Sequence, residues 1–317
     1  MIFCTSLTVS VLAMFAYFKF AKKFAIVDRP NERSSHTQLT YRGGGVVFLV
    51  GASSYYFFSI GHHSFYVGLL LISAISLADD IFSLNPYIRF AIQIASMLLL
   101  FYDINIFSMP FIYIALALVF SVGVINAYNF MDGINGITVL YSFTVLISCF
   151  LTMQILDIDC NLPLGLAPSL LVFAYCNLRT KARCFAGDVG SVSMAFCVIF
   201  MLSLLLRHSL KYEIILFLAV YGIDSVVTIV QRLFARENIF KAHRQHLYQN
   251  MVHKVGLGHL RVAWIYTFVQ ALISALVIVN LRNNLFDDKI FTFTLLATLT
   301  VVYVFIKRKI WLKYDLQ

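Results

Sequence analysis

The sequence predicts an all-α protein, a polytopic bundle of helices that cross a membrane. Hydrophobic residues make up 61% of the 317 residues and charged residues only 12%, a composition that water-soluble domains do not show. Apolar runs of roughly 15 to 22 residues recur along the chain, and each is near the length that a helix needs to cross hydrocarbon. These runs lack the alternation of barrel strands, so helices are the remaining way to span a bilayer.

The apolar runs predict about eleven membrane helices, or ten if one of the two shortest runs does not cross. In chain order the helices are expected at 3–20, 43–60, 64–79, 88–102, 110–127, 136–156, 162–178, 188–206, 213–229, 261–280 and 290–306. No small-residue cleavage pattern follows the first run, so it is read as a membrane helix rather than a signal peptide. We expect one transmembrane domain over residues 1–317, with inner connections at about 21–42, 80–88, 128–135, 179–187 and 230–260.

The positions of Lys and Arg predict the orientation. With the N-terminus on the periplasmic side, the connections facing the cytoplasm hold twenty of the 24 basic residues. The outer connections hold the other four, which are Arg207, Lys211, Arg282 and Lys289. This asymmetry is the positive-inside pattern, and it explains the net charge of +9 without a nucleic-acid partner. Anionic lipid headgroups and phosphate-bearing substrates are the expected partners of such a surface.

Four polar clusters interrupt the apolar pattern, and all of them fall on the predicted cytoplasmic side. They are Asp79-Asp80, the run Asn126–Gly136, Gly187-Asp188-Val189-Gly190-Ser191, and His243-Arg244-Gln245-His246. The outer connections, such as 61–64 and 157–159, contain no residues that are expected to converge. Polar groups at such junctions indicate function, so the clusters predict one shared site that faces the cytoplasm.

The run Asn126–Gly136 is the most polar of these junctions. It contains Asn126, Asn129, Asp132, Asn135 and two glycines, Gly133 and Gly136, within eleven residues. A simple turn between two helices would require one glycine and one Asn at most. We therefore interpret the run as one wall of the site.

The acidic clusters have chemistry suited to phosphate and metal binding. Asp79 and Asp80 repel one another at a helix C-terminus, where the dipole disfavours negative charge, so one of them could hold a proton or help to bind a metal. A solvated helix end is the alternative. Asp188 lies between glycines where a helix begins, a place where backbone N–H groups attract phosphate and a hard cation can bridge to it. An N-cap is the alternative there.

The histidine-rich cluster is suited to binding an anion. His243, Arg244 and His246 could grip a pyrophosphate through charge-assisted hydrogen bonds, although basic residues on an inner loop can also serve topology alone. A zinc site would need further Cys or His ligands that the sequence does not place nearby. Asp224, within a predicted span, is expected either to pair with Arg232 or to belong to the site.

Together these motifs resemble the polyprenyl-phosphate N-acetylhexosamine-1-phosphate transferase superfamily, glycosyltransferase family 4. The resemblance covers residues about 28 to 250 and rests on the order of the four clusters. The elements 33–36 (Arg-Ser-Ser-His) and 42–45 (Arg-Gly-Gly-Gly) are most similar to the branch that initiates O-antigen synthesis. Two departures are Tyr41, where proline is frequent, and Arg244-Gln245, which interrupt the consecutive histidines of the muramoyl branch.

The resemblance implies roles for individual residues. Asn129 and Asp188 correspond to ligands of Mg²⁺, for which Mn²⁺ can substitute. The implied catalytic residues are Asp79, Asp80, Asp132 and Asp188. The implied substrate-binding residues are Asn126, Gly133 and Asn135, near the nucleoside, and His243, Arg244 and His246, near the pyrophosphate and sugar.

The implied reaction is transfer of an N-acetylhexosamine 1-phosphate from a UDP-amino sugar to undecaprenyl (polyprenyl) phosphate, with release of UMP. It would begin the synthesis of a lipid-linked glycan, such as O-antigen or a similar surface polysaccharide, in the bacterial inner membrane. The alternatives are a muramoyl-pentapeptide-type transferase and, from another class, a secondary transporter, whose site would lie near the bilayer midplane. The expected partners are the two substrates and the bilayer, with a homodimer allowed. Which amino sugar is used is left open.

Overall fold

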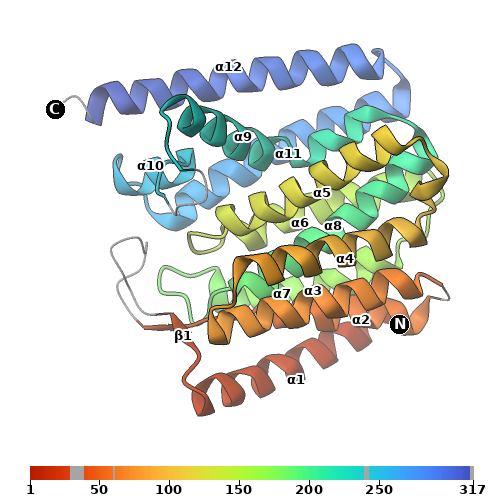
Figure 1. The fold of residues 1–317 in the computed structure, drawn as a ribbon, viewed down its shortest axis with the longest axis vertical. Coiled ribbons are helices and arrows are strands. Elements are labelled where there is room, and N and C mark those ends of the chain that lie inside the picture. Colours follow the sequence, from red (N-terminus) through yellow and green to blue (C-terminus); the bar gives the residue numbers. More distant parts are fainter. Residues whose placement is uncertain (29–38, 60, 239–242, 315–317) are drawn as a thin grey trace.

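The computed structural model describes residues 1–28, 39–59, 61–238 and 243–314, and helices form nearly all of its regular structure (Figure 1). The long helices are α1 Ile2–Lys23, α2 Val46–Phe58, α3 His63–Phe82, α4 Pro86–Asp103, α5 Phe111–Met131, α6 Ile137–Ile155, α7 Asn161–Asn177, α8 Gly187–Ser209, α9 Ala219–Phe234, α11 His259–Asn283 and α12 Asp288–Tyr314. The short elements are β1 Val27–Asp28, β2 Thr40–Tyr41, η1 Ile106–Ser108, η2 Tyr212–Leu218 and α10 Leu247–His253.

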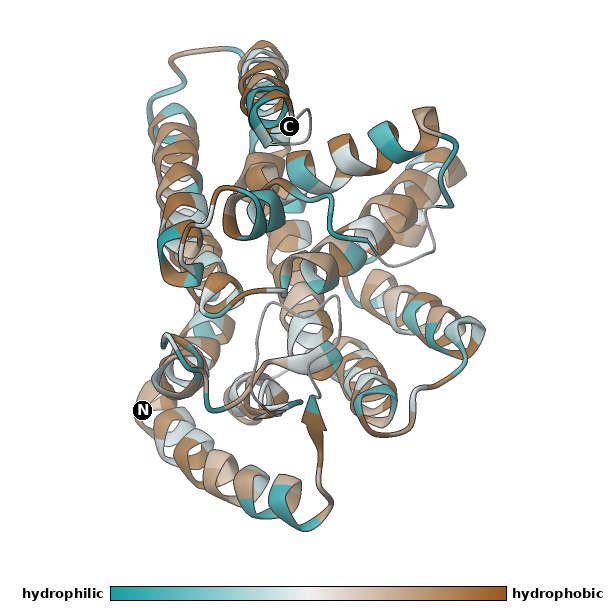
Figure 2. Ribbon diagram, turned by 90° about the vertical axis from the view of Figure 1, so that its left-hand side faces the viewer, coloured by the Kyte–Doolittle hydropathy of each residue, from teal (hydrophilic) through white to brown (hydrophobic). Residues whose placement is uncertain are grey.

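The predicted fold class, a polytopic membrane bundle, is confirmed. In the described part of the chain, eight helices are long and apolar enough to cross a membrane, α9 being counted together with η2. Hydrophobic residues line the lengths of the helices, whereas hydrophilic residues gather in the connections (Figure 2). Each of the eleven predicted runs overlaps a helix or, for 213–229, η2 with α9. The number of helices that cross the membrane, and the orientation of the chain in it, stay predictions.

Helix α8 is the centre of the bundle, and α12 is at its edge. Nearly every residue in the first five turns of α8 is buried, and α8 packs against α2, α3, α5 and α6. Helix α12, in contrast, fully buries only Tyr303 and Lys307; Leu296 and Leu299 pack in part against the core, and many of its other apolar side chains are exposed. An apolar helix with so little protein contact requires lipid around it.

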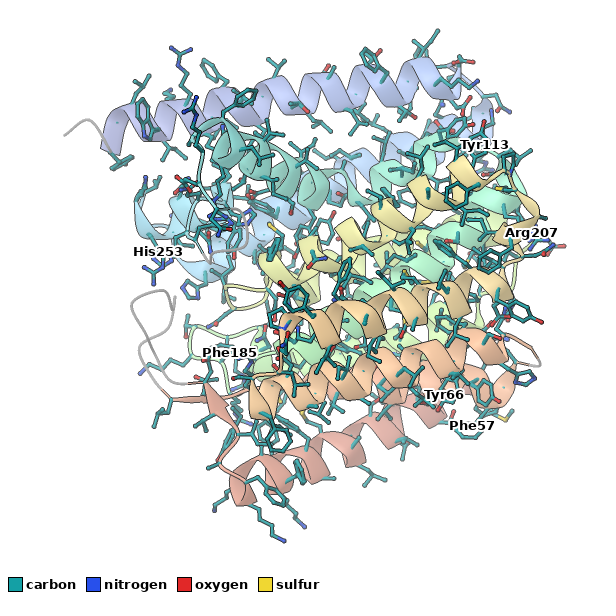
Figure 3. The ribbon with its side chains drawn as sticks, viewed as in Figure 1. Phe57, Tyr66, Tyr113, Phe185, Arg207 and His253 are labelled. Carbon is teal, nitrogen blue, oxygen red and sulfur yellow. The ribbon has the colours of Figure 1, made fainter. Side chains whose placement is uncertain are left out.

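The connections predicted to face the cytoplasm gather at one end of the bundle. Phe185 and His253 lie at that end, whereas Phe57, Tyr113 and Arg207 lie at the other (Figure 3). Helix α5 continues to Met131, past its predicted end at residue 127, so Asn129 belongs to its last turn rather than to the connection. The element 33–36 lies outside the described residues.

The opposite end also contains a polar cluster, so the expectation that the outer connections do not converge is wrong. Residues of α2, α4, α8 and their connections line a cavity of about 350 Å³ there. His62 Nδ1 lies 3.3 Å from Asp103 Oδ1, and Ser59 Oγ donates to Asp159 Oδ2 at 3.2 Å. The sequence analysis missed this cluster because its members are isolated residues that only folding brings together.

The segment 43–45, between β2 and α2, packs against the start of α8 at the distance that only glycine allows. Gly44 N donates to Phe185 O at 2.9 Å, and Gly45 N donates to Ala186 O at 3.0 Å. A Cβ added to Gly45 would lie 2.2 Å from Gly190 Cα, and one added to Gly190 would lie 2.7 Å from Gly45 Cα. Such contacts between small residues are a common way for membrane helices to associate.

We expect Gly190→Ala to lower the free energy of unfolding by about 1–3 kcal/mol, because the new methyl group forces α2 and α8 apart. Thermal unfolding of the purified protein in a neutral detergent measures this. Gly222→Ala on α9 is the matched control, since no atom lies within 4 Å of its added Cβ. Equal transition temperatures for the two variants would contradict the close-packing argument.

Candidate active site

The site is built on the carboxylate of Asp80, in the last turn of α3. Its side chain is fully buried, and its Oδ1 lies 2.6 Å from Nε of Arg42. It also accepts hydrogen bonds from the backbone N–H groups of Asp188, at 3.0 Å, and Val189, at 3.1 Å. These N–H groups belong to the first turn of α8, where no intrahelical acceptor exists, so Asp80 takes the place of an N-cap from another helix.

Gly187 makes this arrangement possible. Its φ is +72°, which is in the left-handed region that glycine favours. A Cβ at this position would lie 2.5 Å from Asp80 Oδ2. The glycine before Asp188 therefore lets the carboxylate of Asp80 approach the start of α8.

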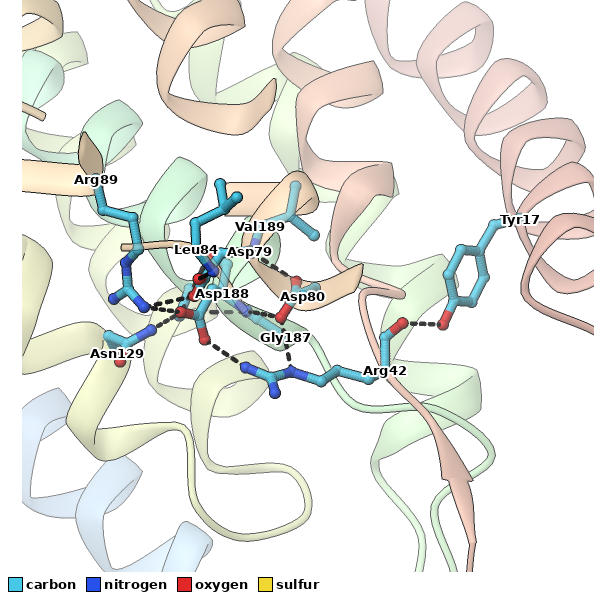
Figure 4. A network of polar contacts seen from close by, with 11 residues as sticks. Tyr17, Arg42, Asp79, Asp80, Leu84, Arg89, Asn129, Gly187, Asp188 and Val189 are labelled. Atoms are coloured by element: carbon cyan, nitrogen blue, oxygen red, sulfur yellow. Dashed lines mark hydrogen bonds and ion pairs between the residues drawn. The ribbon is translucent and has the colours of Figure 1, made fainter. Parts of the chain in front are cut away.

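Two arginines join the three carboxylates into one network (Figure 4). Arg42 Nη2 lies 2.9 Å from Asp188 Oδ1, and Arg89 Nη1 lies 3.5 Å from Asp188 Oδ2. Arg89 Nη1 also lies 2.5 Å from Asp79 Oδ2, while the other oxygen of Asp79 accepts from Leu84 N at 2.7 Å. About a third of each arginine side chain is exposed, so each guanidinium has donors that can reach a ligand.

Asn129 joins the same network from α5. Its Nδ2 donates to Ser191 Oγ at 3.3 Å, and Ser191 stands one turn into α8. The amide oxygen of Asn129 and the carboxylate of Asp188 are ligands of the type that Mg²⁺ accepts. In the described part of the chain, no three His, Cys, Asp or Glu side chains are grouped as a metal site. Mg²⁺ needs only one or two carboxylates when water and substrate phosphates complete its shell, so the donor set fits.

Asp132 follows α5 directly and is half-buried. Its Oδ1 accepts from Thr138 Oγ1 at 2.5 Å. Burial raises the pKa of Asp132 to about 7, and although the Thr138 hydroxyl opposes this, the charges of Asp188 and Asp80 raise it further. This carboxyl group can therefore exchange a proton near neutral pH.

The other amides of the run 126–136 have structural contacts. Asn126 Nδ2 donates to Val122 O, one turn earlier in α5, at 2.8 Å. Asn135 is 5% exposed, and its Nδ2 donates to the backbone oxygens of Arg179 at 2.9 Å and Thr180 at 3.1 Å. The structure therefore gives Asn135 the task of fixing this connection to the neighbouring one, and both implied nucleoside contacts stay predictions.

A second buried carboxylate, Asp224 of α9, organises the histidine-rich segment. It accepts from Tyr266 Oη at 2.6 Å and Tyr303 Oη at 2.8 Å, and from Leu247 N at 3.1 Å. Its Oδ1 lies 3.0 Å from His246 Nδ1. The expected pairing with Arg232 is replaced by this contact, because Arg232 turns to Glu237, 2.9 Å away.

The two histidines have different surroundings. His246 is 2% exposed; its Nδ1 meets Asp224, and among the described residues its Nε2 has no hydrogen-bond partner. The ring of His243 lies 4.9 Å from that of His246. Burial lowers the pKa of His243 to about 4, and neighbouring positive groups act in the same direction, so this imidazole is neutral at pH 7. Neutral His243 can donate or accept a hydrogen bond but adds no charge to anion binding.

Tyr248 connects the histidine-rich segment to the run 126–136. Its hydroxyl donates to Phe130 O at 2.8 Å, and a Cβ on Gly133 would lie 2.2 Å from that hydroxyl. Gly133 therefore makes room for Tyr248 of α10, and its implied contact with the nucleoside stays a prediction. Arg244 lines a separate cavity beside α12, together with Lys254 and Lys307.

The structure thus brings Asp79, Asp80, Asn129 and Asp188 together and adds Arg42 and Arg89, which the sequence analysis did not include among the site residues. Both arginines had been counted only as topology signals or motif members. Arg42 pairs with Asp188, 146 positions away, and although Arg89 follows Asp79 by only ten positions, nothing in the sequence indicated that these side chains meet. The result is an end of the bundle with acidic, amide and guanidinium groups together, which suits a phosphorylated substrate and a divalent cation.

Comparisons with known proteins agree with this chemistry. The sequence profile of glycosyl transferase family 4 matches residues 62–206. The chain is 24% identical over 266 residues to a probable undecaprenyl-phosphate N-acetylglucosaminyl 1-phosphate transferase of Bacillus subtilis (strain 168), covering 76% of this chain and 73% of the relative. It is 27% identical over 302 residues to the undecaprenyl-phosphate alpha-N-acetylglucosaminyl 1-phosphate transferase of Escherichia coli (strain K12), covering 84% and 80%.

We expect Asp80→Asn to lower the free energy of unfolding by about 3–5 kcal/mol, because it leaves Arg42 and the start of α8 without their buried partner. Thermal unfolding in detergent measures the loss. Asp159→Asn is the matched control, since its partner Ser59 is exposed at the other end of the bundle. A loss no larger than that of the control would show that Asp80 does not hold the site together.

We expect Asp224→Asn to loosen α10 locally, because each hydrogen bond to a buried charge contributes about 1.5–3 kcal/mol. Hydrogen–deuterium exchange in the segment 247–253 should then be roughly 10- to 100-fold faster. The connection 179–187 has no contact with Asp224 in the described part of the chain, so it serves as the internal control and should keep its exchange rate. Unchanged exchange in α10 would refute the assigned role of Asp224.

Proposed function

Because the chain belongs to glycosyl transferase family 4, we propose that it transfers a sugar phosphate from a nucleotide sugar to a polyprenyl phosphate in a membrane. The observation that carries the proposal is the network of Arg42, Arg89 and Asp188 at one end of the bundle. Both substrates are anions, so the site must hold them together against their repulsion. Arginines that keep N–H donors available to a ligand, and that lie beside metal-binding carboxylates, meet this requirement.

The arginines are positioned by the acidic pair. Asp80 fixes Nε of Arg42, whose Nη2 donates to Asp188, and Asp79 fixes Nη1 of Arg89. This leaves Nη1 of Arg42 and the Nε and Nη2 of Arg89 for phosphate oxygens. One residue of the pair Asp79 and Asp80 was expected to hold a proton or to help bind a metal. Since their oxygens are engaged by arginine and backbone donors, we assign them the positioning of these two arginines and of the start of α8.

Asp188 and Asn129 would hold Mg²⁺, with Mn²⁺ as a substitute, by carboxylate and amide oxygens. The bound ion would neutralise charge on the pyrophosphate of the sugar nucleotide. His246, held by Asp224, has its Nε2 as the remaining polar group of the imidazole. We assign this atom a hydrogen bond to the sugar phosphate.

The reaction is a displacement at phosphorus. An oxygen of the lipid phosphate attacks the β-phosphorus of the UDP-sugar, and the bond from that phosphorus to the bridging oxygen breaks. The bridging oxygen leaves with UMP and keeps the electron pair, so a lipid-linked sugar diphosphate remains. If the lipid phosphate arrives protonated, Asp132 takes that proton, since its surroundings suit proton exchange near neutral pH.

The finer assignments extend this proposal. The names of the relatives favour an N-acetylhexosamine donor, with N-acetylglucosamine first among the candidates. We propose initiation of O-antigen or a similar surface polysaccharide at the bacterial inner membrane as the physiological role. The muramoyl-pentapeptide donor is the second candidate. A secondary transporter is disfavoured because the polar network lies at the helix ends rather than midway along them (Figure 4).

We expect purified protein in detergent with undecaprenyl phosphate and Mg²⁺ to release UMP from UDP-N-acetylglucosamine or a related UDP-amino sugar. Chelation of the metal should stop release, and Asp188→Asn should lower the rate at least about 100-fold, because both changes remove charge stabilisation of the transition state. A UMP-coupled assay with a panel of UDP-sugars, including the muramoyl-pentapeptide donor, measures this.

Asp159→Asn is the matched control for this assay, because it makes the same change at the opposite end of the bundle. Near-normal turnover by Asp188→Asn would remove Asp188 from the metal site. Absence of UMP with every donor, together with uptake of a solute into vesicles, would replace the enzyme with a transporter.

A further inference from the structure

The cavity of about 350 Å³ at the end of the bundle opposite the candidate active site has no part in the proposed reaction. Helices α2, α4 and α8 and the connections before α3 and α7 form its walls. The polar and charged residues that line it are Tyr55, His62, Asp103, Asp159, Arg207 and His208. Figure 3 shows Arg207 at this end and His253 at the other. The cavity is therefore separate from the site of the proposed chemistry.

Tyr55 brings an unpartnered hydroxyl to this cavity. The residue is 4% exposed, and its hydroxyl makes no hydrogen bond within the described part of the chain. The carboxylates that act on this hydroxyl are those of Asp159 and Asp103, which line the same cavity. Because buried polar groups nearly always have a hydrogen-bond partner, the hydroxyl indicates that the cavity receives a polar group.

The carboxylates of the cavity form no ion pair with a Lys or Arg in the described part of the chain. The side chain of Asp103 is 13% exposed; it accepts from Phe65 N at 2.6 Å, and His62 Nδ1 lies 3.3 Å away without forming a hydrogen bond. Asp159, which is exposed, accepts from Asn161 N at 2.9 Å. A largely buried carboxylate is costly without a positive partner, so a cation would be stabilised beside Asp103.

Arg207 adds a group that can bind an anion. Its Nη1 donates to Ile104 O, the carbonyl next to Asp103 along the chain, so the guanidinium is held at the same cavity. In the described residues Arg207 pairs with no carboxylate, and it is exposed. Since one carbonyl engages only one of its five N–H groups, the others can reach a phosphate. The cavity thus has groups for a cation and for a phosphate side by side.

The residues next to this cavity indicate that its ligand is a lipid. Tyr102, which precedes Asp103 on α4, is 71% exposed, and Leu210, which ends α8, is 75% exposed. Tyrosine is enriched where hydrocarbon meets the headgroup layer, and an exposed leucine suits contact with acyl chains. The ends of membrane helices lie in that layer, so a headgroup can enter the cavity while its chains stay in hydrocarbon.

We propose that this cavity binds the headgroup of a phospholipid that carries a primary ammonium, such as phosphatidylethanolamine. The ammonium donates to Asp103 and to the hydroxyl oxygen of Tyr55, and the phosphate accepts from Arg207. The quaternary ammonium of phosphatidylcholine has no N–H to donate, and phosphatidylglycerol has no cation, so neither satisfies the same groups. Bound lipid joins α2, α4 and α8 at this end of the bundle.

Binding is measured by native mass spectrometry of the full chain, purified in a neutral detergent and titrated with each phospholipid. The three lipids have the same acyl chains and are phosphatidylethanolamine, phosphatidylcholine and phosphatidylglycerol. We expect the dissociation constant of the first bound lipid to be about tenfold lower for phosphatidylethanolamine than for the other two, since a hydrogen bond to a charged group stabilises by roughly this factor or more. Equal dissociation constants for the three lipids would overturn the proposal.

Tyr55→Phe separates a ligand contact from a structural role. It removes a hydroxyl that no described residue contacts by a hydrogen bond, so the fold should keep its stability while the preference for phosphatidylethanolamine is lost. Tyr113→Phe is the matched control, because Tyr113 is 56% exposed at the same end and does not line the cavity (Figure 3). Thermal unfolding without added lipid verifies that both variants are folded. A preference that survives Tyr55→Phe, or that is lost equally in Tyr113→Phe, would refute the assignment.

Arg207→Gln tests the phosphate contact. Because all three phospholipids carry the phosphate, this change should weaken the binding of each about tenfold. Arg282→Gln removes the same charge from the end of α11, outside the cavity, and should leave the three dissociation constants unchanged. Equal effects of the two changes would show that general surface charge, rather than the cavity, binds the lipid.

Phosphoethanolamine provides the last comparison, because it has the same ammonium and phosphate but no acyl chains. It is added at millimolar concentration to the chain with bound phosphatidylethanolamine, at constant ionic strength. The proposal requires that the lipid stays bound. If the soluble compound displaces it, the cavity is a site for a soluble zwitterion and the lipid assignment is wrong. None of these measurements uses the release of UMP, so their outcome is independent of the proposed function.

Discussion

The candidate active site depends on the buried carboxylate of Asp80. A carboxylate removed from water is costly unless it is paired and hydrogen-bonded, and Asp80 obtains its partners from two other segments of the chain. Arg42 comes from the segment between β2 and α2, and the two N–H groups come from the start of α8. The same contacts turn Asp188 toward Arg42 and Arg89. A single electrostatic requirement therefore sets the positions of the metal-binding and phosphate-binding groups.

Asp224 has a corresponding function in the other half of the molecule. It collects donors from α10, α11 and α12 and holds the ring of His246 through Nδ1. The two halves meet where Tyr248 reaches the backbone of Phe130. Asp80 lies in the last turn of α3, whereas Asp224 lies within α9 and is met there by the first N–H of α10 and by two tyrosine hydroxyls. The rigid bundle thus supports a polar surface at one end.

Much of this architecture could be predicted, because apolar runs and basic connections follow directly from the cost of placing polar groups in lipid. The acidic and amide clusters were predicted as members of one site for the same reason. The individual roles were less accessible. Asn135 lies in a polar run that indicates ligand binding, but its side chain donates to two backbone oxygens. Arg42 and Arg89 were read as topology signals and motif members, since nothing in the sequence indicates which carboxylates they pair with.

The sequence by itself determined that this protein lies in lipid, that it is helical, and at which end of the bundle the site is expected. Those properties depend on composition and on periods within one helix, which are local. Only the tertiary structure decided which charges pair. Ion pairs such as Arg42 with Asp188 join residues 146 positions apart. Their formation depends on how α2 and α8 approach at Gly45 and Gly190, and side-chain packing in three dimensions sets that approach.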